Sequence, residues 1–136
     1  MRNNIYLIAM CFPVLLPIQL KSSDCSKIRK GMFYFYPPNS ADEYRIFRGD
    51  SIQAEVKIGS RDTSYWKINW KNDCLFTLNF IRKNTKLSDA ENNFYKSHTT
   101  LCKVLDITPD YYVFKAGLDS IKGLGSVTDT LWFKQR

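Results

Sequence analysis

The side chains that could carry catalysis are few in this sequence, and each has an ordinary structural explanation. Ser97 precedes the single histidine, His98, but no G-x-S-x-G segment is present to expose a serine nucleophile. Acidic pairs occur at Asp42–Glu43 and Asp89–Glu91, where elements are expected to begin and where acids suit turns and helix N-termini. The GLGS stretch at 123–126 lacks the lysine and the strand–helix setting of a phosphate-binding loop. The sequence therefore predicts a protein that is not an enzyme.

The cysteines indicate a disulfide rather than a metal site. No C-x-x-C spacing exists and there is one histidine, so we expect neither a metal nor a cofactor. Cys25 precedes the first expected strand and Cys74 opens a later one. Linking them would close a loop of about 50 residues, worth about 4 kcal/mol on the loop-entropy model. Cys102 lies within a strand pattern, where a free cysteine commonly behaves as a small buried hydrophobe.

Arg48, Gln53 and Glu55 form the polar group of most interest. Gln53 and Glu55 share one face of an expected strand, and Arg48 can reach them across a hairpin at Gly49–Asp50. Two explanations stay open. The group could be a cross-strand pairing worth about 0.2–1 kcal/mol. It could instead lie at the mouth or in the interior of a barrel and orient a ligand.

Aromatic residues are the second candidate for a binding site. They make up 15% of the chain and fall in alternating runs, a pattern typical of strands. The interior of an eight-stranded barrel is either filled by side chains or left as a pocket for a small ligand, and bulky rings favour filling. The aromatic residues that could bound such a pocket are Trp66, Trp70, Phe76, Phe80, Tyr112, Phe114 and Trp132.

The elements that must position these side chains are predicted to be eight short strands and one short helix. Ser88, with Glu91 three residues later, forms a capping-box pattern that begins a helix within 86–98. Polar and apolar residues alternate as in half-buried antiparallel strands, as they do from Ile52 to Ile58, where Gln53, Glu55 and Lys57 form the polar face. Strands are expected at 31–37, 42–48, 51–58, 64–70, 74–81, 99–107, 110–116 and 126–134.

The short connections favour one mainly β domain over 22–136, folded as an antiparallel up-and-down meander. Such a meander closes as a lipocalin-like small barrel or curls into a strongly curved sheet. A loop at 117–126 would join the last two strands. An immunoglobulin-like sandwich is the alternative, although Trp66 lies only eight residues before Cys74, which is unlike that fold.

The first 21 residues have the pattern of a secretory signal. Arg2 precedes an apolar run from residue 5 to 20, which is short for a membrane span and contains Pro13 and Pro17. A lipid anchor on Cys11 or Cys25 is an alternative, but neither cysteine follows the small residue that lipidation requires. We expect an exported protein of the periplasm, the cell surface or the extracellular space, with the membrane reached only through such an anchor.

The charge of the chain does not predict a nucleic-acid partner. The net charge of +7 falls to +5 when Arg2 and Lys21 are removed with residues 1–21. The basic residues are scattered, whereas nucleic-acid binders concentrate them on one face or segment.

Several of these features together resemble those of small exported or lipoprotein-like bacterial proteins that have no established activity. The motifs are Cys25 after the signal, a first strand with Gly31, Phe33 and Phe35, a hairpin with Arg48, Gln53 and Glu55, and the block Trp66, Trp70 and Cys74. The resemblance covers about residues 24–81 and implies export, a β fold and a Cys25–Cys74 disulfide. Some such proteins carry a topoisomerase name. We do not expect that activity here, because the chain is too short for such an enzyme and carries an export signal.

Two functional hypotheses follow. The first is a non-enzymatic exported barrel that binds a small apolar ligand. The second is an envelope structural or protein-interaction module without a ligand cavity. An enclosed cavity of a few hundred cubic ångströms would favour the first, and a filled interior with an exposed apolar patch would favour the second.

Overall fold

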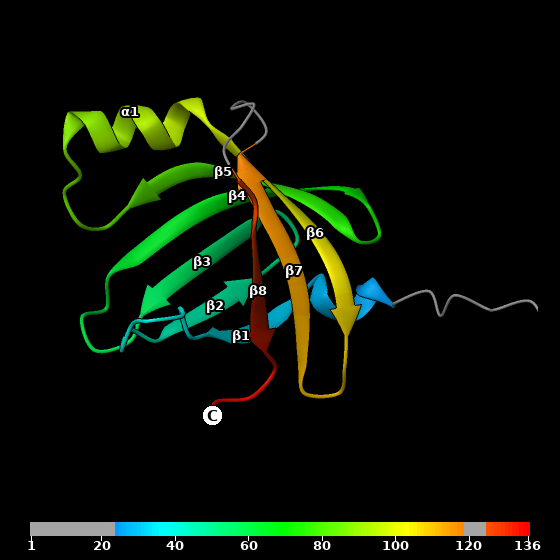
Figure 1. Ribbon diagram of the computed structural model, residues 1–136. Helices are drawn as coiled ribbons and strands as arrows, with labels where there is room; N and C mark the ends of the chain where they lie inside the picture. The colour runs from blue at the N-terminus through cyan, green and yellow to red at the C-terminus, as the bar shows by residue number, and fades with distance from the viewer. Residues whose placement is uncertain (1–23, 119–124) are drawn as a thin grey trace, which may run out of the picture.

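The computed structural model describes residues 24–118 and 125–136 (Figure 1). These residues form a closed antiparallel barrel of eight strands, with one α-helix and one short 3₁₀ helix. The mainly β barrel expected from the sequence is therefore confirmed, and the alternative sandwich is wrong. The signal segment 1–21, with Cys11, and residues 119–124 of the expected loop lie outside the described residues.

The strands follow one another around the barrel in chain order. Each pairs with the next in antiparallel register, and β1 pairs with β8 through Tyr34–Trp132 and Phe35–Leu131 to close the sheet. The strands are β1 (Gly31–Phe35), β2 (Tyr44–Arg48), β3 (Ile52–Lys57), β4 (Thr63–Asn72), β5 (Leu75–Lys83), β6 (Thr99–Ile107), β7 (Tyr111–Leu118) and β8 (Val127–Trp132).

Local sequence signals account for the helix and for the tight β2–β3 connection. Helix α1 (Asp89–Ser97) begins at Ser88, whose side chain accepts from the Glu91 backbone N–H, while the Glu91 carboxylate accepts from the Ser88 backbone N–H. This is the predicted capping box. At the β2–β3 connection, the Gly49 backbone N–H donates to the Ile52 carbonyl at 2.9 Å, which closes the hairpin.

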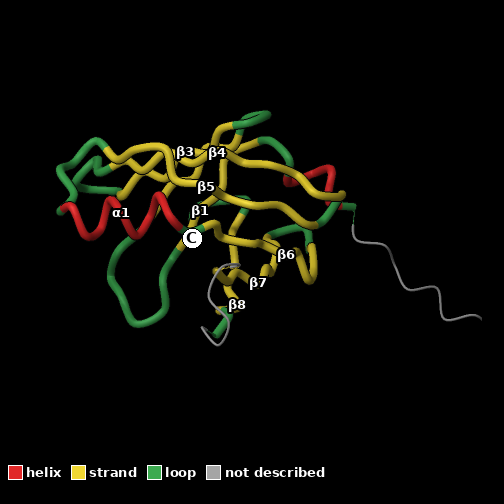
Figure 2. The backbone as a smooth tube through the Cα atoms, turned by 90° about the horizontal axis from the view of Figure 1, so that it is seen from above, coloured by secondary structure: helices red, strands yellow, loops and turns green. Residues whose placement is uncertain are grey.

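The two ends of the barrel differ. The 3₁₀ helix η1 (Cys25–Ile28) lies at one end, where Cys25 and Ile28 are fully buried in the core. We call this the closed end. Helix α1 lies at the other end, alongside β5, as Figures 1 and 2 show. The hydrophobic core is concentrated toward the closed end, around Phe33, Phe76 and Tyr112.

The orientation of β3 is the main departure from the expected pattern. Its apolar residue Ile52 is 42% exposed, whereas Gln53 is only 2% exposed. Gln53, Glu55 and Lys57 all line the barrel interior. In a half-buried strand the apolar face normally packs inward, whereas β3 turns its polar face inward. The interior position of Arg48, Gln53 and Glu55 is one of the two explanations that their sequence pattern left open.

Candidate functional site

The barrel encloses a cavity of about 350 Å³. This volume lies within the range of small-molecule sites in proteins. The interior is therefore not filled throughout. Rings such as Phe33 pack the closed end, whereas others, including Trp66, Phe80 and Phe114, line the empty part.

The cavity has a polar side and an apolar side. Strand β3 contributes only polar residues, namely Gln53, Glu55 and Lys57. Strands four places apart in an eight-stranded barrel face each other, so β7 lies opposite β3. The apolar residues that β1, β5, β7 and β8 contribute are Phe35, Phe76, Leu78, Phe80, Phe114 and Leu131.

Arg48 forms the floor of the polar side. It is 5% exposed and donates three hydrogen bonds: Nε to Gln53 Oε1 (2.8 Å), Nη1 to the Ile28 carbonyl (2.8 Å) and Nη2 to Tyr112 Oη (3.0 Å). Its guanidinium carbon also lies 4.8 Å from the centre of the Phe76 ring. Because a buried charge is costly unless it is hydrogen-bonded, these contacts hold the barrel wall, β7 and η1 around one guanidinium group.

Glu55 lies one step further toward the open end on the same face of β3. Its Oε1 accepts a hydrogen bond from Gln53 Nε2 at 2.8 Å, so Gln53 links the carboxylate to Arg48. Burial raises the pKa of Glu55, and the Gln53 hydrogen bond, the Trp66 indole and the positive charge of Arg48 oppose that rise. The net upward direction means that these partners compensate the carboxylate only in part.

Two further titratable groups in the cavity wall stay protonated at neutral pH. Burial raises the pKa of the Cys102 thiol to about 12, despite the nearby charge of Arg48. Burial likewise raises the pKa of Tyr112 to about 12, against the opposing effect of Arg48. The thiolate is the reactive form of cysteine, so Cys102 behaves as the small buried hydrophobe expected from the sequence.

Ion pairs lie at the open end of the cavity. Lys57 Nζ lies 2.9 Å from Asp42 Oδ2, and Lys83 Nζ lies 3.1 Å from Asp62 Oδ2. Lys57, Lys83 and Asp62 are among the residues that line the cavity. Each lysine is therefore matched by a carboxylate, and the mouth carries paired charges.

Helix α1 contributes one aromatic side chain to this end. The Tyr95 ring lies 5.1 Å from the Phe80 ring and 6.0 Å from the Trp66 ring, between ring centres. Trp66 and Phe80 in turn lie 5.3 Å apart on paired strands. The three rings form an aromatic cluster that attaches α1 to the barrel beside the cavity.

Eight of the ten ligand-binding candidates meet at this cavity. They are Arg48, Gln53, Glu55, Trp66, Phe76, Phe80, Tyr112 and Phe114. Trp70 does not line it; its ring packs against Phe76 (4.7 Å) and beneath Arg29 (4.9 Å). Trp132 also lies elsewhere, between Tyr111 (4.9 Å) and the Arg136 guanidinium (4.5 Å).

Other lining residues were not singled out by their sequence pattern. Tyr44, Ser64 and Tyr95 line the cavity, as do Lys57 and Lys83. Lys57 could have been found, because it shares the alternating face of Gln53 and Glu55. Tyr95 offered no such signal, because its position depends on how α1 packs against β5.

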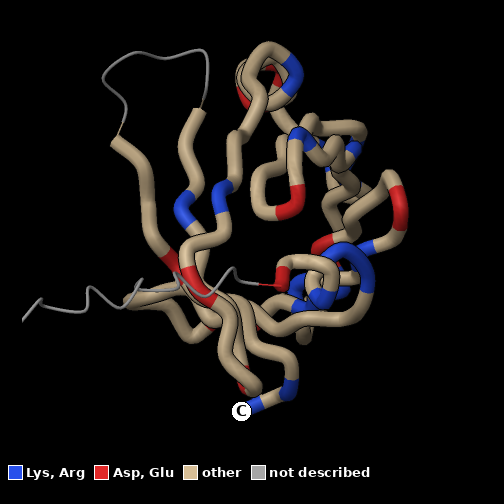
Figure 3. The backbone as a smooth tube through the Cα atoms, turned by 90° about the vertical axis from the view of Figure 1, so that its right-hand side faces the viewer, with Lys and Arg blue, Asp and Glu red and all other residues tan. Residues whose placement is uncertain are grey.

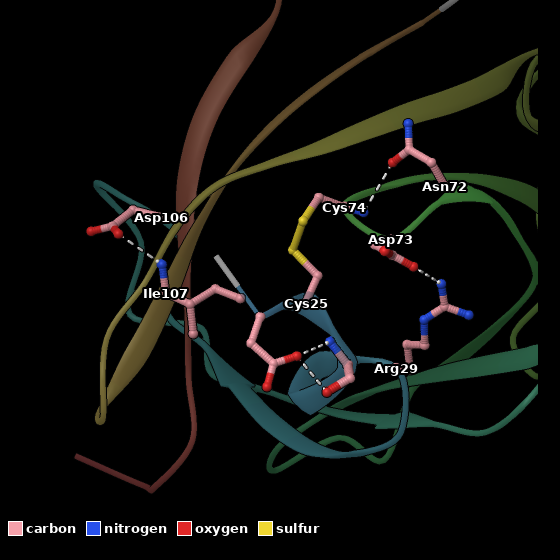
Figure 4. Close-up of a disulfide and its surroundings, with 9 residues drawn as sticks. Cys25, Arg29, Asn72, Asp73, Cys74, Asp106 and Ile107 are labelled. Atoms are coloured by element: carbon pink, nitrogen blue, oxygen red, sulfur yellow. Dashed lines mark hydrogen bonds and ion pairs between the residues drawn. A yellow bond between two sulfur atoms is a disulfide. The ribbon is translucent and has the colours of Figure 1, made fainter. Parts of the chain in front are cut away.

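The Cys25–Cys74 disulfide closes the opposite end (Figure 4). It joins η1 to the turn between β4 and β5, and an ion pair between Arg29 and Asp73 (3.0 Å) lies beside it. The predicted pairing is confirmed, and Cys102 is a free, buried cysteine. The disulfide also occupies the Cys25 sulfur, which a lipid anchor at that residue would require.

The single histidine, His98, follows α1, with its Nδ1 2.7 Å from the Phe94 carbonyl. Within residues 24–118 and 125–136, no three His, Cys, Asp or Glu side chains are grouped to hold a metal ion. The helices in this part of the chain are all too short or too polar to cross a membrane. Lysine and arginine are spread over the barrel among acidic residues, as Figure 3 shows.

Comparison of the chain with protein-family models, with curated proteins and with solved structures gives no match. The resemblance to small exported bacterial proteins therefore stays a prediction from the quoted motifs.

Proposed function

We propose that this protein is an exported, non-enzymatic barrel that binds a small, largely apolar molecule in its cavity. The observation that carries the proposal is the cavity of about 350 Å³ with an apolar side and a few placed polar groups. Small-molecule sites have this composition: mostly hydrophobic walls with a small number of polar groups that fix orientation.

Two features support export. The N-terminal segment has the pattern of a secretory signal. The Cys25–Cys74 disulfide is of a kind that persists in oxidising compartments. Fractionation of cells that express the tagged full chain tests this part. Mature protein in the envelope or medium, with an oxidised Cys25–Cys74 peptide, is expected, and reduced protein in the cytosol would contradict it.

Ligand binding is best tested by native mass spectrometry of protein purified from its own host's envelope, followed by titration with an environment-sensitive naphthalene dye. A co-purifying apolar molecule that the dye displaces supports the proposal. Ser64→Phe should block dye binding, because Ser64 lines the cavity. Ser51→Phe is the matched control, since Ser51 is exposed in the β2–β3 turn. Equal dye binding by both variants would place the dye outside the cavity and contradict the proposal.

A second candidate function rests on the outer face of the barrel. Met32, Phe47 and Ile52 on β1, β2 and β3 are each 42–43% exposed, and Met32 and Phe47 are paired across their strands. Exposed apolar groups of this kind favour docking to an envelope protein. Phe47→Glu should abolish any such complex while leaving dye binding unchanged, which separates this function from the first.

A further inference from the structure

The Glu55 carboxylate has hydrogen-bonding capacity left over. An ionised carboxylate accepts about four hydrogen bonds. Among the described residues, the hydrogen bond from Gln53 to Oε1 is the one that reaches it with standard geometry. Glu55 lines the cavity, so a ligand group can reach the second oxygen. In the part of the chain that the structure describes, this oxygen accepts no hydrogen bond of standard geometry.

The Trp66 indole N–H is the complementary unused donor. Its Nε1 is buried and, within residues 24–118 and 125–136, has no hydrogen-bond partner. Trp66 pairs with Gln53 across β3 and β4, so its ring lies next to Glu55 on the cavity wall. The indole is close enough to stabilise the ionised Glu55 carboxylate but does not complete a hydrogen bond to it. A buried donor without a partner costs free energy. A ligand atom that accepts from Nε1 would relieve this cost and so strengthen binding.

The charges around this pair are already balanced. Arg48 lies one step below Glu55 and is linked to it through Gln53. At the open end each cavity-lining lysine has its own carboxylate, Lys57 with Asp42 and Lys83 with Asp62. A cationic ligand would be repelled by Arg48, and an anionic ligand would be repelled by Glu55. The cavity therefore favours a neutral polar group.

We infer that the ligand carries one neutral group that both donates and accepts hydrogen bonds, most simply a hydroxyl, which bridges Glu55 and the Trp66 indole. This inference rests on the proposed function and adds the chemical class of the ligand. The hydroxyl oxygen accepts from Trp66 Nε1 and its proton is donated to Glu55. The rest of the molecule is apolar and packs against the opposite wall, where Phe114 and Leu131 lie.

Isothermal titration of the mature, disulfide-bonded protein with four compounds that share one body tests the inference. The compounds are 4-phenylbutan-1-ol, butylbenzene, 4-phenylbutylamine and 4-phenylbutanoate. We expect the alcohol to bind about tenfold more tightly than butylbenzene. This ratio corresponds to the free energy of one buried hydrogen bond together with the relieved cost of the unsatisfied Trp66 N–H. The amine and the carboxylate should bind more weakly than the alcohol.

Two conservative variants test the bridging role. Trp66→Phe removes the indole N–H and keeps an aromatic ring, so the preference for the alcohol over butylbenzene should fall at least about threefold. Trp70→Phe is the matched control and should keep the full preference, because Trp70 does not line the cavity. Glu55→Gln removes the charge while keeping an acceptor, so it should change alcohol binding less than Trp66→Phe does.

The outcomes separate the two proposals. If butylbenzene and the alcohol bind equally, the hydroxyl inference is wrong and the binding function stands. If the amine binds most tightly and Glu55→Gln abolishes that binding, the ligand is a cation and the inference is again overturned. If none of the four compounds binds and the naphthalene dye is also excluded, the proposed function itself fails and the inference fails with it.

Discussion

Replacing Arg48 by methionine is the most direct test of how the closed end is held. The substitution removes three hydrogen bonds, to Gln53, to the Ile28 carbonyl and to Tyr112. Ile28 and Tyr112 are 0% exposed, so water cannot replace the lost donor at either group. Both acceptors become unsatisfied in the interior.

The expected magnitude follows from these contacts. A buried polar group left without a partner costs about 1–3 kcal/mol, so Ile28 and Tyr112 together account for about 2–6 kcal/mol. Removing a buried guanidinium also removes its desolvation cost, which offsets part of this loss. We expect Arg48→Met to lower the free energy of unfolding by about 2–4 kcal/mol. The free energy of unfolding of Arg48→Lys should lie between those of Arg48→Met and the wild type, because lysine keeps the charge but cannot reach all three acceptors.

The assay is urea unfolding followed by tryptophan fluorescence, with the disulfide intact. Arg45→Met on the same strand is the matched control. Arg45 faces outward, with its guanidinium carbon 5.9 Å from the centre of the Tyr34 ring. Arg45→Met should therefore lower the free energy of unfolding by less than about 1 kcal/mol. A loss for Arg48→Met no larger than that for Arg45→Met, with an unchanged denaturant slope, would refute the reasoning. If Arg48→Met does not fold, Arg48→Lys still supplies the comparison.

Three further predictions concern other parts of the fold. Replacing Cys25 and Cys74 together by alanine should cost about 4 kcal/mol in urea unfolding, because the disulfide spans 49 residues; a loss below about 1 kcal/mol would contradict the loop-entropy account. The raised pKa of Glu55 means that the native state holds this proton longer than the unfolded state does. Wild-type stability relative to Glu55→Gln should therefore fall as pH rises from about 4.5 through the raised pKa, and a rising difference would be the wrong sign. Ser88→Ala should weaken α1 by about 1 kcal/mol, read as faster amide exchange in α1 with unchanged barrel amides; equal loss in both would show that α1 is not a separate unit.

The local elements of this fold were predictable because their causes are local. The alternation of Trp66, Ile68 and Trp70 with polar neighbours identified β4, and the Ser88–Glu91 capping box identified the start of α1. The pairing of Cys25 with Cys74 also followed from their places at the ends of elements. Short connections between eight strands left few topologies other than a meander.

The inner and outer faces of the strands were not predictable in the same way. Period-two alternation separates two faces of a strand but does not say which one points inward. On β3 the usual rule gave the wrong answer, because Gln53 and Glu55 satisfy each other and Arg48 inside the barrel. That mutual hydrogen bonding offsets part of the penalty that normally keeps such residues outside.

The sequence by itself determined the strands, the helix, the disulfide and the set of residues from which a site could be built. Only the tertiary structure decided which of them share the cavity. Barrel closure brings β3 opposite β7, so that Glu55 and Phe114 line one cavity. The register of β8 with β1 and β7 instead leaves Trp132 beside Tyr111 and Arg136. These neighbours are far apart in the chain, so their meeting depends on how the sheet closes and on nothing that adjacent residues encode.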